Sequence, residues 1–259
     1  MDFSLKLIDK VGKGYLSYSS IKYALKDMRL WEMYMKGQLK KESAAFTFGG
    51  MYDCMLFTPD EFDKRYFILD DSEIVEAIVT ERPTITSPRM TSKYKNWLKD
   101  YEEEVAEKGM EMISQEDVTK AEEMIQRLKD TGVLEGYLQG DYQHEFNTDL
   151  DGVPVRGFLD CLGGNYITDL KSARDLMKFR YDVRSFDYDI QAHIYTQVLG
   201  IDTFYWVAQE KNYPYPIGVF EATEETLETG RAKFNRAVQL IQKYLDEKDC
   251  NTYYIFDRI

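Results

Sequence analysis

The sequence is poor in the residues from which redox centres and soft-metal sites are built. Its 259 residues include only three cysteines and two histidines. Cys54, Cys161 and Cys250 lie far apart with no C-x-x-C pair, a pattern that fits reduced thiols better than a disulfide framework, a zinc site or an iron–sulfur cluster. His144 and His193 are too few for a multi-histidine metal centre. Any bound metal is therefore expected to be a hard cation with oxygen ligands.

The sequence also lacks the segments that direct a protein into or across a membrane. No run approaches the ~18 consecutive apolar residues of a transmembrane helix. The N-terminus (Met1–Lys6) shows no basic segment followed by an apolar one, so we expect a cytoplasmic protein with no membrane partner. The net charge of −13 weighs against non-specific binding to nucleic acid, but it is compatible with a local basic groove or with carboxylates around a metal.

The chain is expected to form one domain with two regions. Residues 1–140 are predicted to be mainly helical, with helices over 17–37, 42–57, 93–107 and 115–129 and a partly basic loop at 82–93. Residues 141–259 are predicted to form an α/β core. Its strands are expected at 143–148, 153–160, 166–171, 203–210 and 217–221, and its helices at 173–180, 188–199 and 224–247.

The stretch 153–171 carries the polar residues best placed for chemistry. Asp160 ends one predicted strand, and Asp169 and Lys171 lie on the next after a Gly-Gly turn. Residues i and i+2 of a strand share a face, so Asp169 and Lys171 point together, the hairpin can bring Asp160 beside them, and the Leu170 carbonyl faces the same edge. Mg²⁺ and Mn²⁺ prefer such oxygen ligands, and the arrangement suits metal-assisted hydrolysis of a phosphodiester.

The alternative is a surface hairpin with one Asp–Lys pair, worth less than about 1 kcal/mol. The D-x8-D-x-K spacing is common by itself, so other features must decide. Asp169 and Lys171 end an otherwise apolar strand, where unpaired charges are costly. Gln191 and Tyr195 lie four residues apart on a predicted helix, so their side chains share one face. These features favour a functional site.

The chain resembles the PD-(D/E)xK nuclease superfamily in an ordered set of motifs. These are Glu145, Arg156–Asp160 (RGFLD), Ile167–Ala173 (ITDLKSA) and Tyr188–Tyr195 (YDIQAHIY). The branch that it resembles most is that of the RecE-like phage and prophage exonucleases, relatives of the RecB nuclease domain. A looser resemblance extends to residues 15–31, 49–57, 113–117 and 213–230. It implies a restriction-endonuclease-like core, in which helices flank a mixed central β-sheet.

The resemblance implies a role for each motif residue. Asp160, Asp169 and the carbonyl of Leu170 would hold the metal, expected to be Mg²⁺ with Mn²⁺ as a substitute. Lys171 would be the catalytic lysine.

Three further residues complete the implied catalytic set. Gln191 and Tyr195 would orient the site or the DNA backbone, and Glu145 matches an acidic position that supports the metal site. One departure concerns the family's G-x-x-x-H helix, where Asp53 stands in the place of the metal-binding histidine. Asp53 either replaces that histidine as an oxygen ligand, which we favour, or is an acid on the helix surface.

Four residues are candidate contacts with DNA. Arg156 would bind a phosphate or pair with an acid, and Ser172 would bind a terminal phosphate or cap the chain locally. Arg89 and Lys93 would follow the DNA backbone or belong to a solvated loop.

The resemblance implies an exonuclease that digests linear double-stranded DNA from the 5′ end. The remaining 3′ single strands would serve a strand-annealing recombination protein. A homotrimeric or homotetrameric ring around DNA is expected, located in the host cytoplasm if the protein is phage-encoded. One alternative is a RecB-like single-strand-specific nuclease or endonuclease. Another is a catalytically decayed protein that binds DNA ends, which the intact Asp160, Asp169 and Lys171 set disfavours and Asp53 leaves open.

Overall fold

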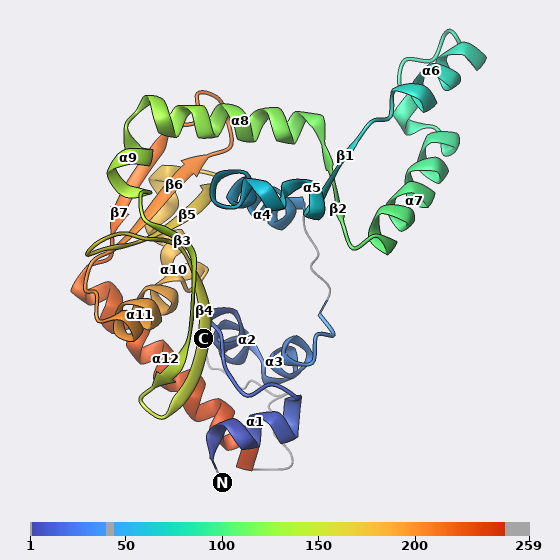
Figure 1. The fold of residues 1–259 in the computed structure, drawn as a ribbon. Coiled ribbons are helices and arrows are strands. Elements are labelled where there is room, and N and C mark those ends of the chain that lie inside the picture. The colour runs from blue at the N-terminus through green and yellow to red at the C-terminus, as the bar shows by residue number, and fades with distance from the viewer. Residues whose placement is uncertain (1, 40–43, 247–259) are drawn as a thin grey trace, which may run out of the picture. The chain divides into compact units, whose positions relative to one another are not determined.

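The computed structural model describes residues 2–39 and 44–246, and the chain divides into two compact units (Figure 1). Unit 1 comprises residues 1–41 and 128–259, and unit 2 comprises residues 42–127. The boundary near residue 140 expected from the sequence does not coincide with this division. Within the described ranges, no helix combines the length and apolarity needed to cross a membrane. Cys250 lies outside the described residues.

Unit 1 is built on a five-stranded mixed sheet in the order β3-β4-β5-β6-β7. The strands are β3 (Asp141–Leu150), β4 (Val153–Leu162), β5 (Ile167–Ala173), β6 (Phe204–Glu210) and β7 (Ile217–Glu221). β5 and β6 run parallel, and the other neighbours are antiparallel. Asp151 and Gly152, both with positive φ, form the tight turn between β3 and β4. The mixed sheet confirms the predicted α/β core.

Helices from both ends of the chain accompany this sheet. They are α1 (Phe3–Val11), α2 (Tyr18–Lys26), α3 (Met28–Met35), α9 (Val133–Tyr137), α10 (Phe179–Ser185), α11 (Tyr188–Leu199) and α12 (Glu224–Asp246). The predicted start of the helix at 173–180 was wrong, because β5 continues to Ala173. A 3-10 turn, η3 (Leu176–Lys178), then leads into α10.

The single helix expected over 17–37 is broken at Asp27. This residue is extended, with φ −168° and ψ 131°, and its carboxylate accepts hydrogen bonds from the amides of Arg29 (2.7 Å) and Leu30 (3.3 Å). An aspartate in this role caps the following helix, so two shorter helices form. The prediction of one continuous helix was therefore wrong.

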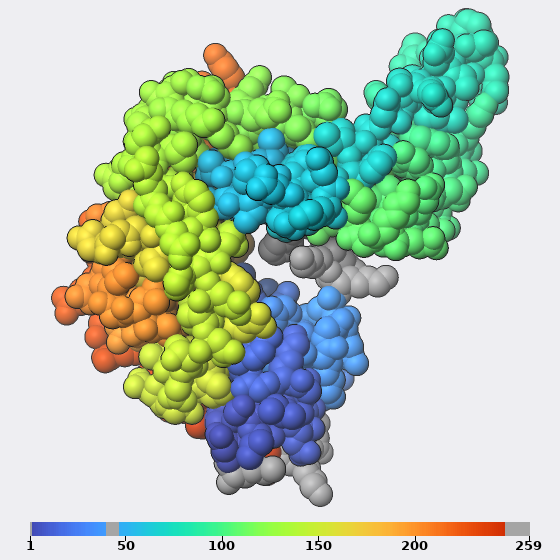
Figure 2. Space-filling view, in the orientation of Figure 1, coloured from blue at the N-terminus to red at the C-terminus, as the bar shows by residue number. Residues whose placement is uncertain are grey.

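One apolar core joins the sheet of unit 1 to these helices. It buries large side chains from distant parts of the sequence, among them Leu7, Trp31, Phe204, Trp206 and Phe234. The N-terminal residues also bond to the β3–β4 hairpin: the amide of Leu16 donates to the carbonyl of Pro154, and its carbonyl accepts from the amide of Arg156, both at 2.8 Å. Figure 2 shows the N-terminal helices (blue) against this hairpin (yellow-green). The first helices thus belong to the sheet-containing unit.

α11 and α12 pack closely because of one glycine. A Cβ at Gly230 of α12 would lie 2.0 Å from the carbonyl oxygen of Asp189 on α11. Only glycine allows the two backbones to approach so closely. The start of α11 is therefore held directly against α12.

Unit 2 contains mostly helices. They are α4 (Ala44–Phe57), the 3-10 turns η1 (Pro59–Glu61) and η2 (Pro88–Met90), α5 (Phe62–Arg65), α6 (Ser72–Glu81), α7 (Ser92–Glu107) and most of α8 (Gln115–Asp130). Two four-residue strands, β1 (Tyr66–Leu69) and β2 (Glu111–Ser114), pair in parallel and were not expected. Ser114 caps the start of α8, since its Oγ accepts from the amide of Asp117 at 3.1 Å.

Candidate active site

A fork between β4 and β5 forms the centre of the site. The two strands pair only at Cys161↔Thr168 and Leu162↔Ile167 and separate at Asp160. At this point a side chain, and not the backbone of β4, accepts the hydrogen bond from β5: Asp160 Oδ2 accepts the amide N–H of Leu170 at 2.9 Å.

The backbone of Leu170 faces this fork. Alternate residues of a strand direct their amide groups to opposite neighbours, so the N–H and C=O of Leu170 both lie on the β4 side. The Leu170 carbonyl and the Asp160 carboxylate therefore share one edge of β5.

Asp169 connects the fork to α11. Its side chain is 3% exposed, its Oδ2 lies 2.5 Å from Lys171 Nζ, and its Oδ1 accepts from Gln191 Nε2 at 2.6 Å. In the described part of the chain, Gln191 Oε1 has no hydrogen-bond partner although it is buried. The Asp169–Lys171 pair of β5 and Gln191 of α11, about 20 residues apart in sequence, thus meet at the Asp169 carboxylate.

The charges at the fork are closely coupled. Burial, together with the neighbouring Asp169 charge, raises the pKa of Asp160 to about 7. Burial lowers the pKa of Lys171, but Asp169 and Asp160 outweigh it and hold that pKa well above its ordinary value. The Tyr188 ring, with its centroid 4.8 Å from Lys171 Nζ, adds a further contact with the ammonium group. Lys171 is therefore charged, and two carboxylates share this one cation.

This donor set fits a hard divalent cation. Two carboxylates and a backbone carbonyl are oxygen ligands of the kind that Mg²⁺ and Mn²⁺ prefer. The raised pKa of Asp160 shows that its negative charge is poorly compensated, and a cation would relieve this. The side chains alone are too few for a closed site: among the described residues, no three His, Cys, Asp or Glu side chains come together as a metal-binding group. Water or substrate would have to complete the coordination.

The sequence matches the family model of a PDDEXK-like domain of unknown function (DUF3799) over residues 17–253. The chain belongs to this family. A crystal structure described as a "putative exonuclease" from Eubacterium rectale is similar, with a TM-score of 0.60 and 16% sequence identity over 98% of this chain and 92% of that one. No curated protein matches. The predicted superfamily and fold class are confirmed.

Tyr195 lies in the core of the PDDEXK-like fold behind Gln191. It is buried, and its ring meets Phe146 edge-on with centroids 5.2 Å apart. Gly157 makes room for this pair, since a Cβ there would come within 2.6 Å of the Phe146 ring and 3.2 Å of the Tyr195 ring. Burial raises the pKa of Tyr195, so its hydroxyl stays protonated. Packing is thus one role of Tyr195 in this fold.

Glu145 and Arg156 pair with each other on the exposed face of the β3–β4 hairpin. Glu145 Oε1 lies 2.6 Å from Arg156 Nε, and Arg156 Nη1 donates to the hydroxyl of Tyr15 at 3.0 Å. Of the two interpretations of Arg156, the structure shows the ion pair. Ser172 is half-buried on β5 next to Lys171.

The remaining candidates lie in unit 2. Asp53 is on α4 and is partly buried. Arg89 makes two contacts with Asp71, from Nε at 2.6 Å and from Nη2 at 3.0 Å, and this pairing lowers the pKa of Asp71 to about 2. Lys93 pairs with Glu81. Both cations therefore bind acidic groups of their own unit.

Two groups of contacts around the site were not expected from the sequence. Tyr188 stands three residues before Gln191, so helical spacing could have placed it on the same face. Lys233 of α12 lies 2.9 Å from Oδ2 of Asp189, which is 1% exposed, and 2.8 Å from Oδ1 of Asp187. No local pattern links Lys233 to α11, because the partners are more than 40 residues apart.

Proposed function

We propose that the protein is a Mg²⁺-dependent deoxyribonuclease that hydrolyses linear double-stranded DNA from its ends. The observation that carries this proposal is the β4–β5 fork, where Asp160, Asp169, Lys171 and the Leu170 carbonyl meet. Membership of a PDDEXK-like family supports a nuclease, and the similarity to a protein described as an exonuclease agrees with it.

The residues of the fork can perform phosphodiester hydrolysis in complementary roles. Asp160, Asp169 and the Leu170 carbonyl would hold the divalent cation. When bound, that cation supplies Lewis-acid polarisation of the phosphate and lowers the pKa of the attacking water. Lys171, charged and fixed by Asp169, donates hydrogen bonds to the negative charge that develops on the phosphate. Gln191 keeps the Asp169 carboxylate in one orientation.

The first experiment compares two DNA substrates in Mg²⁺. A linear 5′-phosphorylated duplex should be degraded, while a covalently closed circle should remain intact. Lys171→Ala should lower the rate by ~10²-fold or more, because it removes a preorganised donor to the developing charge. Lys178→Ala removes an exposed lysine of η3 and should have no effect, which makes it the matched control.

Other outcomes of this experiment contradict parts of the proposal. Cleavage of the closed circle would indicate an endonuclease, and preference for a single-stranded substrate would indicate a RecB-like nuclease. Full activity in Lys171→Ala would show that the fork is not the catalytic site. No hydrolysis in Mg²⁺ or Mn²⁺ would favour a protein that only binds DNA ends.

We further propose that digestion runs 5′ to 3′ and leaves 3′ tails for a strand-annealing recombination partner. We also propose a trimeric or tetrameric ring around the duplex. The support for both is the RecE-like pattern of motifs in the sequence. End-labelled duplexes test the polarity, because loss of a 5′ label as mononucleotides must precede loss of a 3′ label. Sedimentation equilibrium tests the ring, and a monomer at all concentrations would contradict it.

A further inference from the structure

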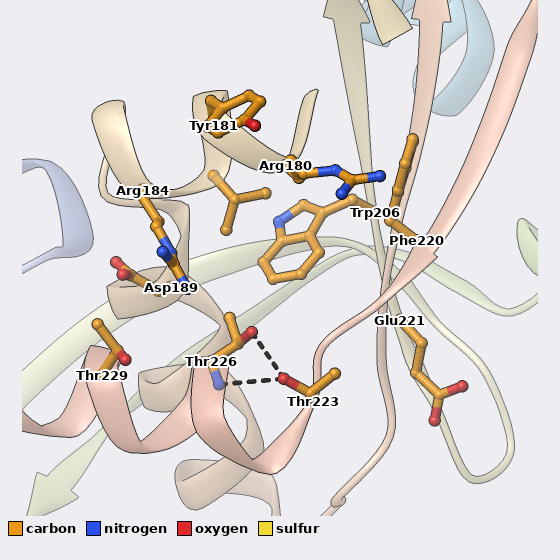
Figure 3. A pocket seen from close by; sticks show the side chains of 11 residues that line it. Arg180, Tyr181, Arg184, Asp189, Trp206, Phe220, Glu221, Thr223, Thr226 and Thr229 are labelled. Carbon is orange, nitrogen blue, oxygen red and sulfur yellow. Dashed lines mark hydrogen bonds between the residues drawn. The ribbon is translucent and has the colours of Figure 1, made fainter. Parts of the chain in front are cut away.

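A cavity, drawn in Figure 3, lies on the face of the sheet that carries Asp169. Asp169 on β5 is the register partner of Trp206 on β6, which in turn is the partner of Phe220 on β7. Partners in neighbouring strands point to the same face, so the three side chains form a row across the sheet. Trp206 and Phe220 line a cavity of about 280 Å³. The cavity therefore begins one strand away from a catalytic carboxylate.

The walls of the cavity combine an aromatic floor with cationic and hydroxyl groups. Arg180 and Arg184 lie one turn apart on α10, and Thr226 and Thr229 come from the first turns of α12 (Figure 3). Arg184 is only loosely engaged, since its Nη2 lies 3.4 Å from Oε1 of Glu225 and both side chains are largely exposed. An exposed pair of this kind contributes little and exchanges readily for a ligand.

The indole N–H of Trp206 is a buried hydrogen-bond donor in the wall of the cavity. Trp206 is 2% exposed, and its Nε1 has no hydrogen-bond partner within the described ranges of the chain. A buried donor without a partner costs free energy unless a ligand or water satisfies it. The two carboxylates that line the cavity do not exclude an anion: Asp189 is neutralised by Lys233 at 2.9 Å, and Glu221 is exposed to solvent at the end of β7.

We propose that this cavity binds one nucleotide unit, with the base on the Trp206 and Phe220 side, where the Arg180 guanidinium also lies, and the phosphate at Arg184 (Figure 3). Aromatic side chains bind bases by stacking, and arginine guanidinium groups bind phosphates with paired hydrogen bonds. The volume lies close to the ~300 Å³ lower end of ligand pockets, which suits a mononucleotide and not a duplex. The biological role of the cavity rests on the proposed nuclease function, because it would hold a nucleotide next to the scissile phosphate.

Isothermal titration calorimetry of the full chain with deoxyadenosine 5′-monophosphate tests this proposal. The titration is run in EDTA, so that binding through a metal at the fork does not contribute. We expect one nucleotide per chain. Deoxyadenosine and inorganic phosphate, titrated separately, should each bind at least tenfold more weakly, because each supplies only half of the contacts.

Variants then locate the binding site. Replacing both Arg180 and Arg184 by Gln should weaken nucleotide binding at least tenfold. Arg236→Gln, at an exposed position of α12 outside the cavity, should leave it unchanged. Trp206→Phe keeps an aromatic ring but removes the N–H donor, so it should weaken binding while the circular dichroism spectrum confirms folding.

Three results would overturn the proposal. They are the absence of binding at millimolar nucleotide, equal binding by the double arginine variant, and equal affinity for deoxyadenosine without its phosphate. The titration involves no hydrolysis, so its outcome is independent of the nuclease assay. Active enzyme without nucleotide binding would refute the cavity alone, whereas binding without DNA hydrolysis would refute the proposed nuclease function.

Discussion

The ion pair between Lys233 and Asp189 supports a quantitative prediction about stability. Lys233 Nζ lies 2.9 Å from Oδ2 of Asp189 and 2.8 Å from Oδ1 of Asp187, and it donates to the carbonyl of Arg184 at 3.2 Å. The side chain of Asp189 is 1% exposed and that of Lys233 is 26% exposed. Lys233 thus neutralises a buried charge at the start of the helix that carries Gln191.

Lys233→Met should destabilise the protein by about 2–3 kcal/mol at neutral pH. Removing one partner of a buried pair costs ~3–5 kcal/mol, and we take a smaller figure because solvent reaches Lys233. This is a large part of the ~5–15 kcal/mol by which a domain is stable.

The loss should depend on pH in a defined direction. Burial already raises the pKa of Asp189, and the loss of Lys233 raises it further. A carboxyl whose pKa is raised in the folded state stabilises that state when protonated and loses this contribution as the pH rises. The variant should therefore be closest to wild type at acidic pH and furthest from it at pH 8.

Urea unfolding at pH 5 and pH 8 measures both effects. Asp189→Asn in the Lys233→Met background should recover part of the loss, because a neutral side chain needs no counter-charge. Lys178→Met removes an exposed lysine and should stay within ~0.5 kcal/mol of wild type. A loss below about 1 kcal/mol in Lys233→Met, or one that is equal at both pH values, would refute the reasoning.

Three further predictions concern packing, pH and metal. Gly157→Ala should lower stability by ~1–3 kcal/mol, because its Cβ would approach the Phe146 ring to 2.6 Å, and an unchanged melting temperature would contradict this. Burial lowers the pKa of His193 to about 4, so stability should fall by about 3 kcal/mol as the pH drops from 6.5 to 4. His193→Gln should reduce this pH dependence. If the free energy of unfolding of the variant falls as steeply in acid as that of the wild type, other groups cause the fall. Mg²⁺ at about 100 times its Kd should stabilise the protein by about 2.7 kcal/mol, measured by thermal unfolding. The same shift in Asp160→Asn would show that the ion binds elsewhere.

Local patterns in the sequence were enough to predict the elements that carry the site. Residue patterns predicted strands at the positions of β3 and β4, and helical spacing predicted α11 and placed Gln191 and Tyr195 on one face. These predictions succeeded because neighbouring residues in a strand or helix have a fixed geometry. The break at Asp27 was also visible in principle, since an aspartate before a helical run is a capping signal.

The sequence by itself determined which residue types are available at the fork and on which elements they lie. Only the tertiary structure decided that β4 leaves β5 at Asp160, that Lys233 meets Asp189, and that Trp206 continues the row from Asp169. The pairing of the four-residue strands β1 and β2 was also decided only by the tertiary structure, because the paired residues lie more than 40 positions apart in sequence. Periodicity reports whether a residue faces a core, but not which distant residue packs against it. That choice is made by the packing of the whole chain, which overrides local preference.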